Sequence, residues 1–584
     1  MGDGQVADGP VGDGPVGDGP VGDGPVGDGK VPSRPADMTS EGMRRLRVVA
    51  FVLAVAVLFG VLDRASAAQP NASAVQATVQ RAPVAAPAGA LSSSWFCAGA
   101  TAAPTSATSS PATSTAGSSP ASSTAGSSTA GSSTASSSPE VRPSPYGEAQ
   151  GQLVIANAGL TAAIATVTDI SSGGSAVESS VKVPARGSLT VPENASGGTG
   201  WEGAIVEVDA GQVVVDQSVN GPLGASSSPC ATSGSPTWYL PTGQTLINAD
   251  EYVSLLNPYP TATIVDLSFL TNQGNEQPQN FQGIDVPADG LVSVDLGAYL
   301  TRRSAIETTV TARMGSVVAW ETEIVTPPPS DVPLVGSAAA AKPLADPAWP
   351  IAGVTVTLGA PAAATSWVWP DGLAGAGMQE KYVVFNPGST TANVRLSIGL
   401  TGAAAEPFSF SVRPGQIVPV VSEQQARIPA GVAHSATLLS INGVPVVAER
   451  TLTASQAAIP VAGAKGIVDG NGQILGGTLR ADSWIVGAAE VDANHVGQLV
   501  IFNPGSAAVS ARATRLSPDA PASLLAGGAV TLPPGGRAAL GVLSEVSGPL
   551  EVTATSPVFV EYDLYGTGGS NGVGLSFAVP LSRS

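Results

Sequence analysis

The sequence predicts an all-β protein of four tandem β-sandwich repeats, of the immunoglobulin or fibronectin type, after a disordered N-terminus and one N-terminal apolar helix. Three observations lead to this prediction. Every second residue is apolar in runs such as 392–398, as in half-buried strands. No stretch of helical periodicity follows residue 70. A Trp followed by an Asn recurs at intervals of about 100 to 130 residues, which is the length of whole domains rather than of solenoid units.

The N-terminal segment, residues 1–43, is predicted to be a disordered leader. It repeats Val-Gly-Asp-Gly-Pro, and a segment of Gly and Pro cannot form a core. Its glycine spacing matches a nucleotide-binding motif by accident, because neither a strand nor a helix flanks it. Met38 and Met43 are alternative start sites to Met1.

Residues 44–67 have the parts of a signal peptide or signal anchor. Three arginines, at 44, 45 and 47, precede the apolar run 48–62, and Ala-Ser-Ala ends at Ala67. Fifteen residues span about 22 Å as a helix, which is short of the roughly 30 Å hydrocarbon core, so cleavage after Ala67 is favoured over a retained single-pass anchor. Either outcome predicts an exported chain, in the cell envelope or outside it, with the N-terminal segment in contact with the membrane.

The rest of the chain divides into a linker, 68–92, and four predicted β-sandwich units: 93–235, 236–364, 365–481 and 482–584. Unit 1 contains a Ser/Thr-rich insert, 99–145, typical of a flexible and O-glycosylated spacer or of an unmodified loop. The Trp-to-Asn spacing is 62 in unit 1 and 19 in the others, and the excess of 43 is close to the length of the insert. Pairs of units forming larger sandwiches or barrels are the alternative.

Two residues of each repeat have an expected structural role. The tryptophans are predicted core anchors, with an exposed row that binds sugar as the alternative: Trp95, Trp238, Trp367 and Trp484. The asparagines begin turns, three of them as Asn-Pro, where Asn bonds its own backbone: Asn157, Asn257, Asn386 and Asn503.

A later strand of each unit ends near an acid: Asp216, Glu321, Glu449 and Glu561. The two carboxylates of a glycosidase lie about 5–10 Å apart. Acids at one position of separate domains are expected to lie far apart, so we predict that these four face solvent or cap turns.

The two cysteines, Cys97 and Cys230, are predicted to form a disulfide, with two free thiols as the alternative. They flank the strands of unit 1, and export to an oxidising compartment permits the bond.

The composition excludes several function classes. The net charge of −19 argues against binding of nucleic acid, and two His and two Cys argue against metal clusters. His434 and His495 fall in different repeats and are expected at the surface or in loops. Residues 568–572 match G-x-S-x-G but occupy a turn between strands, and 469–472 resembles an incomplete calcium loop. Asn71 and Asn194 fit the N-glycosylation pattern. We predict no catalytic residue, metal or cofactor.

The Trp…Asn-Pro-Gly spacing, the Pro-Gly turn, the Val-Val-x-Glu strand and Trp95-Phe96-Cys97 resemble the exported actinobacterial proteins with domain of unknown function 5719. The resemblance covers residues 93–584 apart from the insert. It implies a cell-envelope location and offers no catalytic residues. The expected function is therefore a non-enzymatic structural or interaction scaffold, with envelope proteins or cell-wall glycan as partners. A carbohydrate-binding or adhesion protein and a hydrolase are the alternatives.

Overall fold

The computed structural model describes residues 82–103, 145–198, 200–326, 351–400, 403–489, 491, 493–543, 548–567 and 571–582. These residues belong to one compact unit, Ser73–Ser584. They contain no α-helix, and the two short helical turns are of the 3-10 type: η1 (Gln279–Phe281) and η2 (Ser422–Gln424). Within this part of the chain no helix has the length and hydropathy to span a membrane. The all-β prediction is confirmed. The predicted leader, the apolar segment 44–67 and insert residues 104–144 lie outside the described residues.

The strands follow one another in the same order in all four repeats. The first repeat has β1 (Ser93–Thr101), β2 (Gln150–Asn157), β3 (Ala163–Ser171), β4 (Ala176–Val183), β5 (Gly187–Pro192), β6 (Trp201–Val208), β7 (Val213–Gly221) and β8 (Gly224–Pro229). The second has β9 (Thr237–Leu240), β10 (Ala249–Asn257), β11 (Thr263–Thr271), β12 (Gly274–Glu276), β13 (Ile284–Val286), β14 (Gly290–Asp295), β15 (Ile306–Ala312), β16 (Val318–Val325) and β17 (Gly353–Leu358). The third has β18 (Ser366–Trp369), β19 (Met378–Asn386), β20 (Ala392–Leu400), β21 (Ala403–Ala404), β22 (Phe408–Val412), β23 (Gln416–Val421), β24 (His434–Ser440), β25 (Val447–Ala458) and β26 (Ile467–Leu475). The fourth has β27 (Ala481–Val486), β28 (His495–Phe502), β29 (Val509–Arg515), β30 (Ser523–Leu532), β31 (Arg537–Val542), β32 (Leu550–Gly566), β33 (Val573–Phe577) and β34 (Val579–Pro580).

Each repeat contributes two antiparallel sheets. In the second repeat the inner sheet has the order β14-β10-β16-β17 and the outer sheet the order β12-β11-β15-β9. The third repeat has the same arrangement, with β23-β19-β25-β26 inside and β21-β20-β24-β18 outside. In the first repeat a short contact between β1 and β2 joins the two sheets, and in the fourth repeat the long strand β32 belongs to both. Outer-sheet strand β11 alternates buried and half-buried residues, as the period of a strand requires.

The strand order differs from the immunoglobulin arrangement that the sequence suggested. In constant-type immunoglobulin domains the first two strands lie in the same sheet. Here the first strand of the second repeat, β9, pairs with β15 in the outer sheet, whereas the second strand, β10, pairs with β14 and β16 in the inner sheet. In the fourth repeat one continuous strand, β32, pairs in both sheets. The alternation of apolar residues predicts strands, but it does not specify their partners, so the sequence left this order undetermined.

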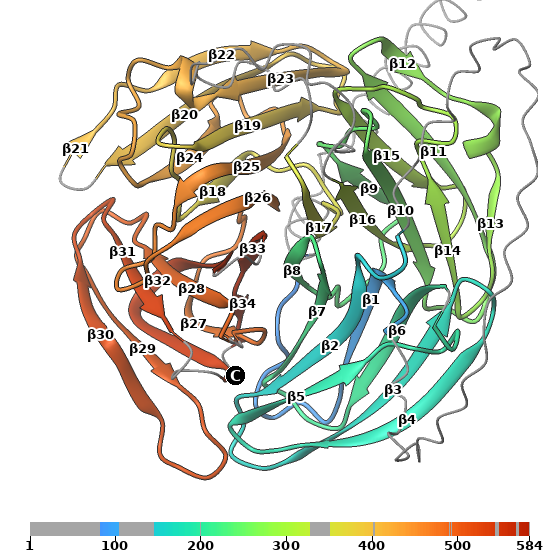
Figure 1. The fold of residues 1–584 in the computed structure, drawn as a ribbon, viewed down its shortest axis with the longest axis horizontal. Coiled ribbons are helices and arrows are strands. Elements are labelled where there is room, and N and C mark those ends of the chain that lie inside the picture. The colour runs from blue at the N-terminus through green and yellow to red at the C-terminus, as the bar shows by residue number, and fades with distance from the viewer. Residues whose placement is uncertain are drawn as a thin grey trace, which may run out of the picture. The chain divides into compact units, whose positions relative to one another are not determined.

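The last strand of each inner sheet lies at the centre of the arrangement (Figure 1). Strand β8 contacts β17 and β33, and β26 contacts the same two strands. The four strands therefore form a closed circuit, and each repeat has a neighbour on both sides. We call the contact between two neighbouring repeats a joint, and name the joints 1/2, 2/3, 3/4 and 4/1.

Small side chains let the central strands approach closely. A Cβ atom on Gly472 would lie 2.6 Å from the carbonyl oxygen of Val573, so this position of β26 requires glycine. Between β8 and β17, the hydroxyls of Ser226 and Ser228 accept hydrogen bonds from the backbone N–H groups of Val356 and Leu358, at 3.2 and 3.3 Å. Short polar side chains thus satisfy backbone donors that no neighbouring strand pairs.

Two features fix the N-terminal part of the described chain: one ties it to the C-terminal segment, and the other closes the first repeat. Ala85, in the predicted linker 68–92, is buried and pairs with Leu581 near the C-terminus, with its N–H donating to the carbonyl of Pro580 at 3.0 Å. The predicted disulfide is present: Cys97 of β1 is bonded to Cys230 after β8, and both residues are fully buried. The disulfide joins the first and last segments of the first repeat.

Candidate functional site

The repeat tryptophans are buried. Trp95, Trp238, Trp367 and Trp484 are between 0% and 3% exposed. The indole N–H of Trp238 donates to the carbonyl of Val317 at 2.7 Å, and that of Trp367 to the carbonyl of Val446 at 2.8 Å. These bonds tie the first strand of each of these repeats to the residue directly before its eighth strand, β16 or β25. The tryptophans therefore do not form an exposed row that stacks on sugar.

Each repeat asparagine holds the turn that follows it. In the fourth repeat, the amide oxygen of Asn503 accepts from the N–H of Gly505 at 2.9 Å, while its NH₂ group donates to the carbonyls of Ala507, Leu532 and Pro533 at 2.8–3.1 Å. The same pattern recurs in the other repeats, at Asn157, Asn257 and Asn386. The asparagine thus fixes its own turn and, in three repeats, also the Pro-containing turn about thirty residues later.

Replacing Asn503 by Ala is expected to destabilise the protein by about 2–4 kcal/mol, because several buried carbonyls lose their donor at once. Urea unfolding followed by tryptophan fluorescence measures the change. N503D separates the two halves of the role, because Asp keeps the bond from Gly505 but has no NH₂ group. We expect N503D to be nearly as unstable as N503A, and parent-like stability of N503D would contradict the role of the donors.

The repeat acids lie at the joints, so the prediction that they face solvent is wrong. Asp216 accepts from the backbone N–H of Ala488 at 2.9 Å, Glu449 from the hydroxyl of Thr242 at 2.7 Å, and Glu561 from the N–H of Asp371 at 3.0 Å. Every acceptor is at most 4% exposed. Every donor lies four residues after the Trp of the preceding repeat. One contact thus recurs at joints 4/1, 2/3 and 3/4.

Glu321 is the exception among the four acids. Asp216, Glu449 and Glu561 pair across the inner sheet with the residue three before the repeat asparagine, whereas in the second repeat that position pairs with Trp320. Glu321 is displaced by one residue and therefore points to the opposite face of its sheet. At joint 1/2 its neighbour Thr322 makes the equivalent contact, donating its hydroxyl to the carbonyl of Gly99, four residues after Trp95.

Joint 2/3 gathers four buried carboxyls: Glu251, Glu321, Glu323 and Glu449. Burial is the main cause that raises the pKa of each, and repulsion from neighbouring carboxyls adds to it for Glu251, Glu321 and Glu449. The pKa of Glu323 rises to about 7 and that of Glu449 to about 8, with Lys381 opposing both shifts. The expectation that repeat acids lie far apart fails here, because Glu321 and Glu449 interact across the joint.

Raised carboxyl pKa values predict that stability falls as pH rises from about 4 to about 8. Burial also raises the pKa of Asp216 to about 7. When the pKa of an acid is higher in the folded state than in the unfolded state, the folded state binds more protons. The resulting stabilisation is complete below the pKa of the unfolded state and is lost as the pH rises through the pKa of the folded state. Each group contributes up to about 1.4 kcal/mol per pH unit. Urea midpoints measured from pH 5 to pH 8 should decrease, and D216N, which keeps an acceptor for Ala488, should decrease less steeply. A stability that stays flat or rises between pH 5 and pH 8 would contradict raised pKa values for the buried carboxyls at joints 2/3 and 4/1.

Joint 3/4 is held by charged groups. The guanidinium of Arg450 donates to Glu561 at 2.7 Å and to the backbone carbonyl of Asp371. Arg537 pairs with the carboxylate of Asp371, to which Gln498 also donates at 2.9 Å. Burial opposes the charge of Arg450, but the surrounding carboxylates outweigh it and raise its pKa. Burial also raises the pKa of Glu561 although Arg450 lowers it.

His434 is a buried strand residue, contrary to the prediction of a surface or loop position. Its Nε2 lies 2.8 Å from the carboxylate of Glu380, and both side chains are fully buried. Burial lowers the pKa of His434, but Glu380 more than compensates, so its pKa is raised. The hydroxyl of Ser422 donates to the same carboxylate at 2.7 Å. Because Ser422 bonds the acid rather than the imidazole, the three groups do not form a nucleophilic triad.

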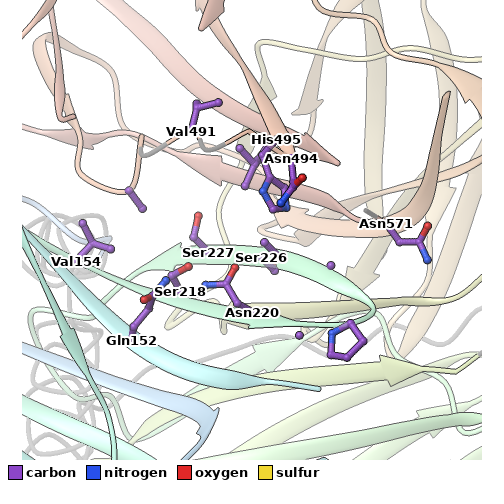
Figure 2. A pocket seen from close by; sticks show the side chains of 16 residues that line it. Gln152, Val154, Ser218, Asn220, Ser226, Ser227, Val491, Asn494, His495 and Asn571 are labelled. Atoms are coloured by element: carbon purple, nitrogen blue, oxygen red, sulfur yellow. The ribbon is translucent and has the colours of Figure 1, made fainter. Parts of the chain in front are cut away.

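A pocket of about 590 Å³ lies at joint 4/1. Figure 2 shows Gln152, Ser218 and Asn220 on strands of the first repeat, with Asn494 and His495 on the opposite side. His495 begins β28 and is half-buried rather than at the surface. Of the described residues that line this pocket, none is Asp, Glu, Lys or Arg. The described part of the lining is rich in amides and hydroxyls.

The remaining predicted sites are placed as follows. Residues 469–472 lie in strand β26 rather than in a loop, with Asp469 accepting from Gln456 and Asn471 donating to Glu323. Asn194 is half-buried, and its N–H donates to Asp169 at 2.5 Å. Residues 568–570 of the G-x-S-x-G match and Asn71 lie outside the described residues. Sequence reasoning missed Arg450, Asp371 and Glu380, although the two charges directly after the apolar run 444–448, Glu449 and Arg450, were a signal of burial with a partner.

Comparison with known proteins finds a family match over part of the chain. Residues 193–363, from the later part of the first repeat through the second, match the model described as "Family of unknown function (DUF5719)", which confirms the resemblance seen in the sequence. No curated protein matches the chain. A solved structure from Thermotoga maritima, protein 1070, is 18% identical, with 20% of this chain and 94% of that chain covered and a TM-score of 0.17. A glycoside hydrolase family 32 protein from Bifidobacterium adolescentis is 10% identical, with 72% and 98% covered and a TM-score of 0.10. TM-scores this low support no inference about this chain.

Proposed function

We propose that the protein is an exported or membrane-anchored component of the cell envelope that acts as a non-enzymatic scaffold, built from four two-layer β-sandwiches in a closed circuit. One observation carries the proposal: the residues that recur in the repeats are used to hold the circuit together. The tryptophans anchor strands, the asparagines hold turns, and the position four residues after each Trp binds the next repeat. A rigid frame of this kind suits presentation of a surface to envelope proteins or cell-wall glycan.

Two further features support export. The buried Cys97–Cys230 disulfide suits an oxidising compartment, and the arginine-flanked apolar segment 44–67 suits a secretion signal or anchor that contacts the membrane. The low His content and the acidic net charge are compatible with a chain whose partners are not nucleic acids.

Localisation in bacteria tests the proposal. The full-length chain with a C-terminal tag should fractionate with the envelope or medium, be degraded when protease is added to spheroplasts, and show no reactive thiol when denatured without reductant. A matched variant lacking residues 44–67 should remain in the cytosol. A parent chain found in the cytosol, with two reactive thiols, would overturn the proposal.

A further inference from the structure

A second, smaller cavity, of about 150 Å³, lies within the first repeat. Strands β3 and β4 form one wall, and β2, β5 and the residues directly after β5 form the other. Val177 of β4 is 52% exposed, so the cavity opens to solvent at this edge of the repeat. Two acids lie on opposite walls: Asp169 on β3 and Glu193 directly after β5.

Both acids are buried, and each has one oxygen held by the protein and the other without a partner. Asp169 is 8% exposed and Glu193 is fully buried. One oxygen of Asp169 accepts from the N–H of Asn194 at 2.5 Å, and one oxygen of Glu193 accepts from the amide of Gln217 at 2.9 Å. Their second oxygens, Oδ1 and Oε1, have no hydrogen-bond partner among the described residues, and neither has the amide oxygen of Asn194, which also lines the cavity.

The electrostatics of this end of the first repeat favour a cation. Burial raises the pKa of Glu193 well above its usual value, and the nearby charges of Asp169 and Glu202 raise it further. Glu202 is fully buried, and its oxygens accept from the backbone N–H groups of Ala195 and Ser196 at 3.2 and 2.9 Å. A cation in the cavity would reduce the repulsion among the acids and would contact the oxygens that lack a partner.

The donor atoms select the kind of cation. Two carboxylates and a side-chain amide offer only oxygen, whereas zinc sites in proteins are built mainly from nitrogen and sulfur ligands. Calcium takes about six to eight oxygen ligands in a flexible geometry, and magnesium requires a near-ideal octahedron. No group of three His, Cys, Asp or Glu side chains in the described residues is arranged to hold a metal ion, so water would complete the ligand shell in this open cavity.

We propose that this cavity binds one calcium ion, with the unpartnered oxygens of Asp169, Glu193 and Asn194 as its protein ligands. Because Asp169 and Glu193 lie on opposite walls, the ion ties the two walls together. It does so where the chain enters the Ser/Thr-rich insert, since the N–H of Ala103 donates to the carbonyl of Glu193 at 2.8 Å. Binding depends on the cavity and not on where the protein is located.

Isothermal titration calorimetry on the full-length chain tests the proposal, after removal of metal with EDTA and at pH 8. Calcium chloride should show one site per chain with a dissociation constant on the order of 10⁻⁴ M, as in extracellular calcium modules, and magnesium chloride should bind more weakly. Calcium should also raise the thermal midpoint, because a ligand that binds only the folded state stabilises it.

Two variants locate the site. D169N and E193Q each keep an acceptor for the existing hydrogen bond but lose a negative charge. Each should weaken calcium binding at least about tenfold and remove the calcium-dependent rise of the thermal midpoint. Without calcium, both should melt at or above the temperature of the parent, because a buried charge is removed. E207Q is the matched control: it removes an exposed acid from β6 of the same repeat and should bind as the parent does.

The proposal is overturned if calcium gives neither heat nor a shift of the midpoint, if D169N and E193Q bind calcium as the parent does, or if magnesium binds as tightly as calcium. R142Q tests for a different cation in the same cavity, a guanidinium from outside the described residues. It should bind calcium as the parent does, and calcium binding seen only in R142Q would overturn the proposal. None of these results bears on export, which the localisation experiment decides.

Discussion

Replacing Arg450 with Met is expected to lower the free energy of unfolding by about 3–5 kcal/mol, because one partner of a fully buried ion pair is removed and the other remains. Glu561 would keep its carboxylate at joint 3/4 without the guanidinium 2.7 Å away, and the carbonyl of Asp371 would lose its donor. Urea unfolding at pH 7 measures the change. Because the ion pair crosses from the third repeat to the fourth, the loss should also expose this joint to hydrogen exchange first.

The chain contains a matched control for this variant. Arg427 pairs with Glu406 at 3.6 Å within the third repeat, where the two side chains are 45% and 78% exposed. Exposed pairs of this kind contribute little, so R427M should stay within about 1 kcal/mol of the parent. A double variant, R450M with Glu561→Gln, should recover part of the loss since it removes the unpaired charge. Equal effects of R450M and R427M would contradict the role given to Arg450.

Removing the disulfide with C97A and C230A is expected to cost about 4–5 kcal/mol. The bond closes a loop with a sequence separation of 133, and restricting the unfolded chain over that length has this value in the chain-entropy model. Reductant added to the parent should lower its stability toward that of the double variant and leave the variant unchanged. A loss below about 1 kcal/mol would mean that the first repeat is held by its joints rather than by the bond.

The local structure could be predicted from the sequence because it depends on neighbouring residues. Alternating apolar residues in 392–398 predict the strand that β20 forms, since successive side chains of a strand point to opposite faces. The Asn-Pro-Gly turns followed from the chemistry of three adjacent residues. The disulfide followed from two cysteines in a chain whose residues 44–67 are predicted to be a secretion signal.

The joints could not be predicted because they depend on how the repeats meet. Asp216 and Ala488 are separated by 272 positions in the sequence, and the spacing of the repeat gives no sign that the first repeat contacts the fourth. The predicted solvent-facing location of the repeat acids was wrong for the same reason. In separate domains these acids would face water, whereas here the neighbouring repeats bury them. The continuous apolar run before Glu321, Val-Val-Ala-Trp, was a signal, since strands buried on both faces lack polar alternation.

The one-residue displacement of Glu321 from the position of the other repeat acids could not be predicted from the sequence either. Its distance from the repeat asparagine, 64 residues, is close to the 63 of Glu449, so spacing alone makes the two equivalent. Only the cross-strand register shows that Trp320 occupies the equivalent position and that Glu321 faces the other way. A shift of one residue in a strand moves the side chain to the opposite face.

The central claim is that the four repeats form a closed circuit, and cutting the chain once tests it most directly. A protease site inserted between Ala362 and Ala363, in the connection between the second and third repeats, divides the chain into two halves that the disulfide does not link. A closed circuit holds the halves at both joint 2/3 and joint 4/1. After complete cleavage under native conditions, sedimentation velocity should therefore show one particle with the parent's sedimentation coefficient. Two separate, slower species would contradict the closed circuit and describe independent domains on a string.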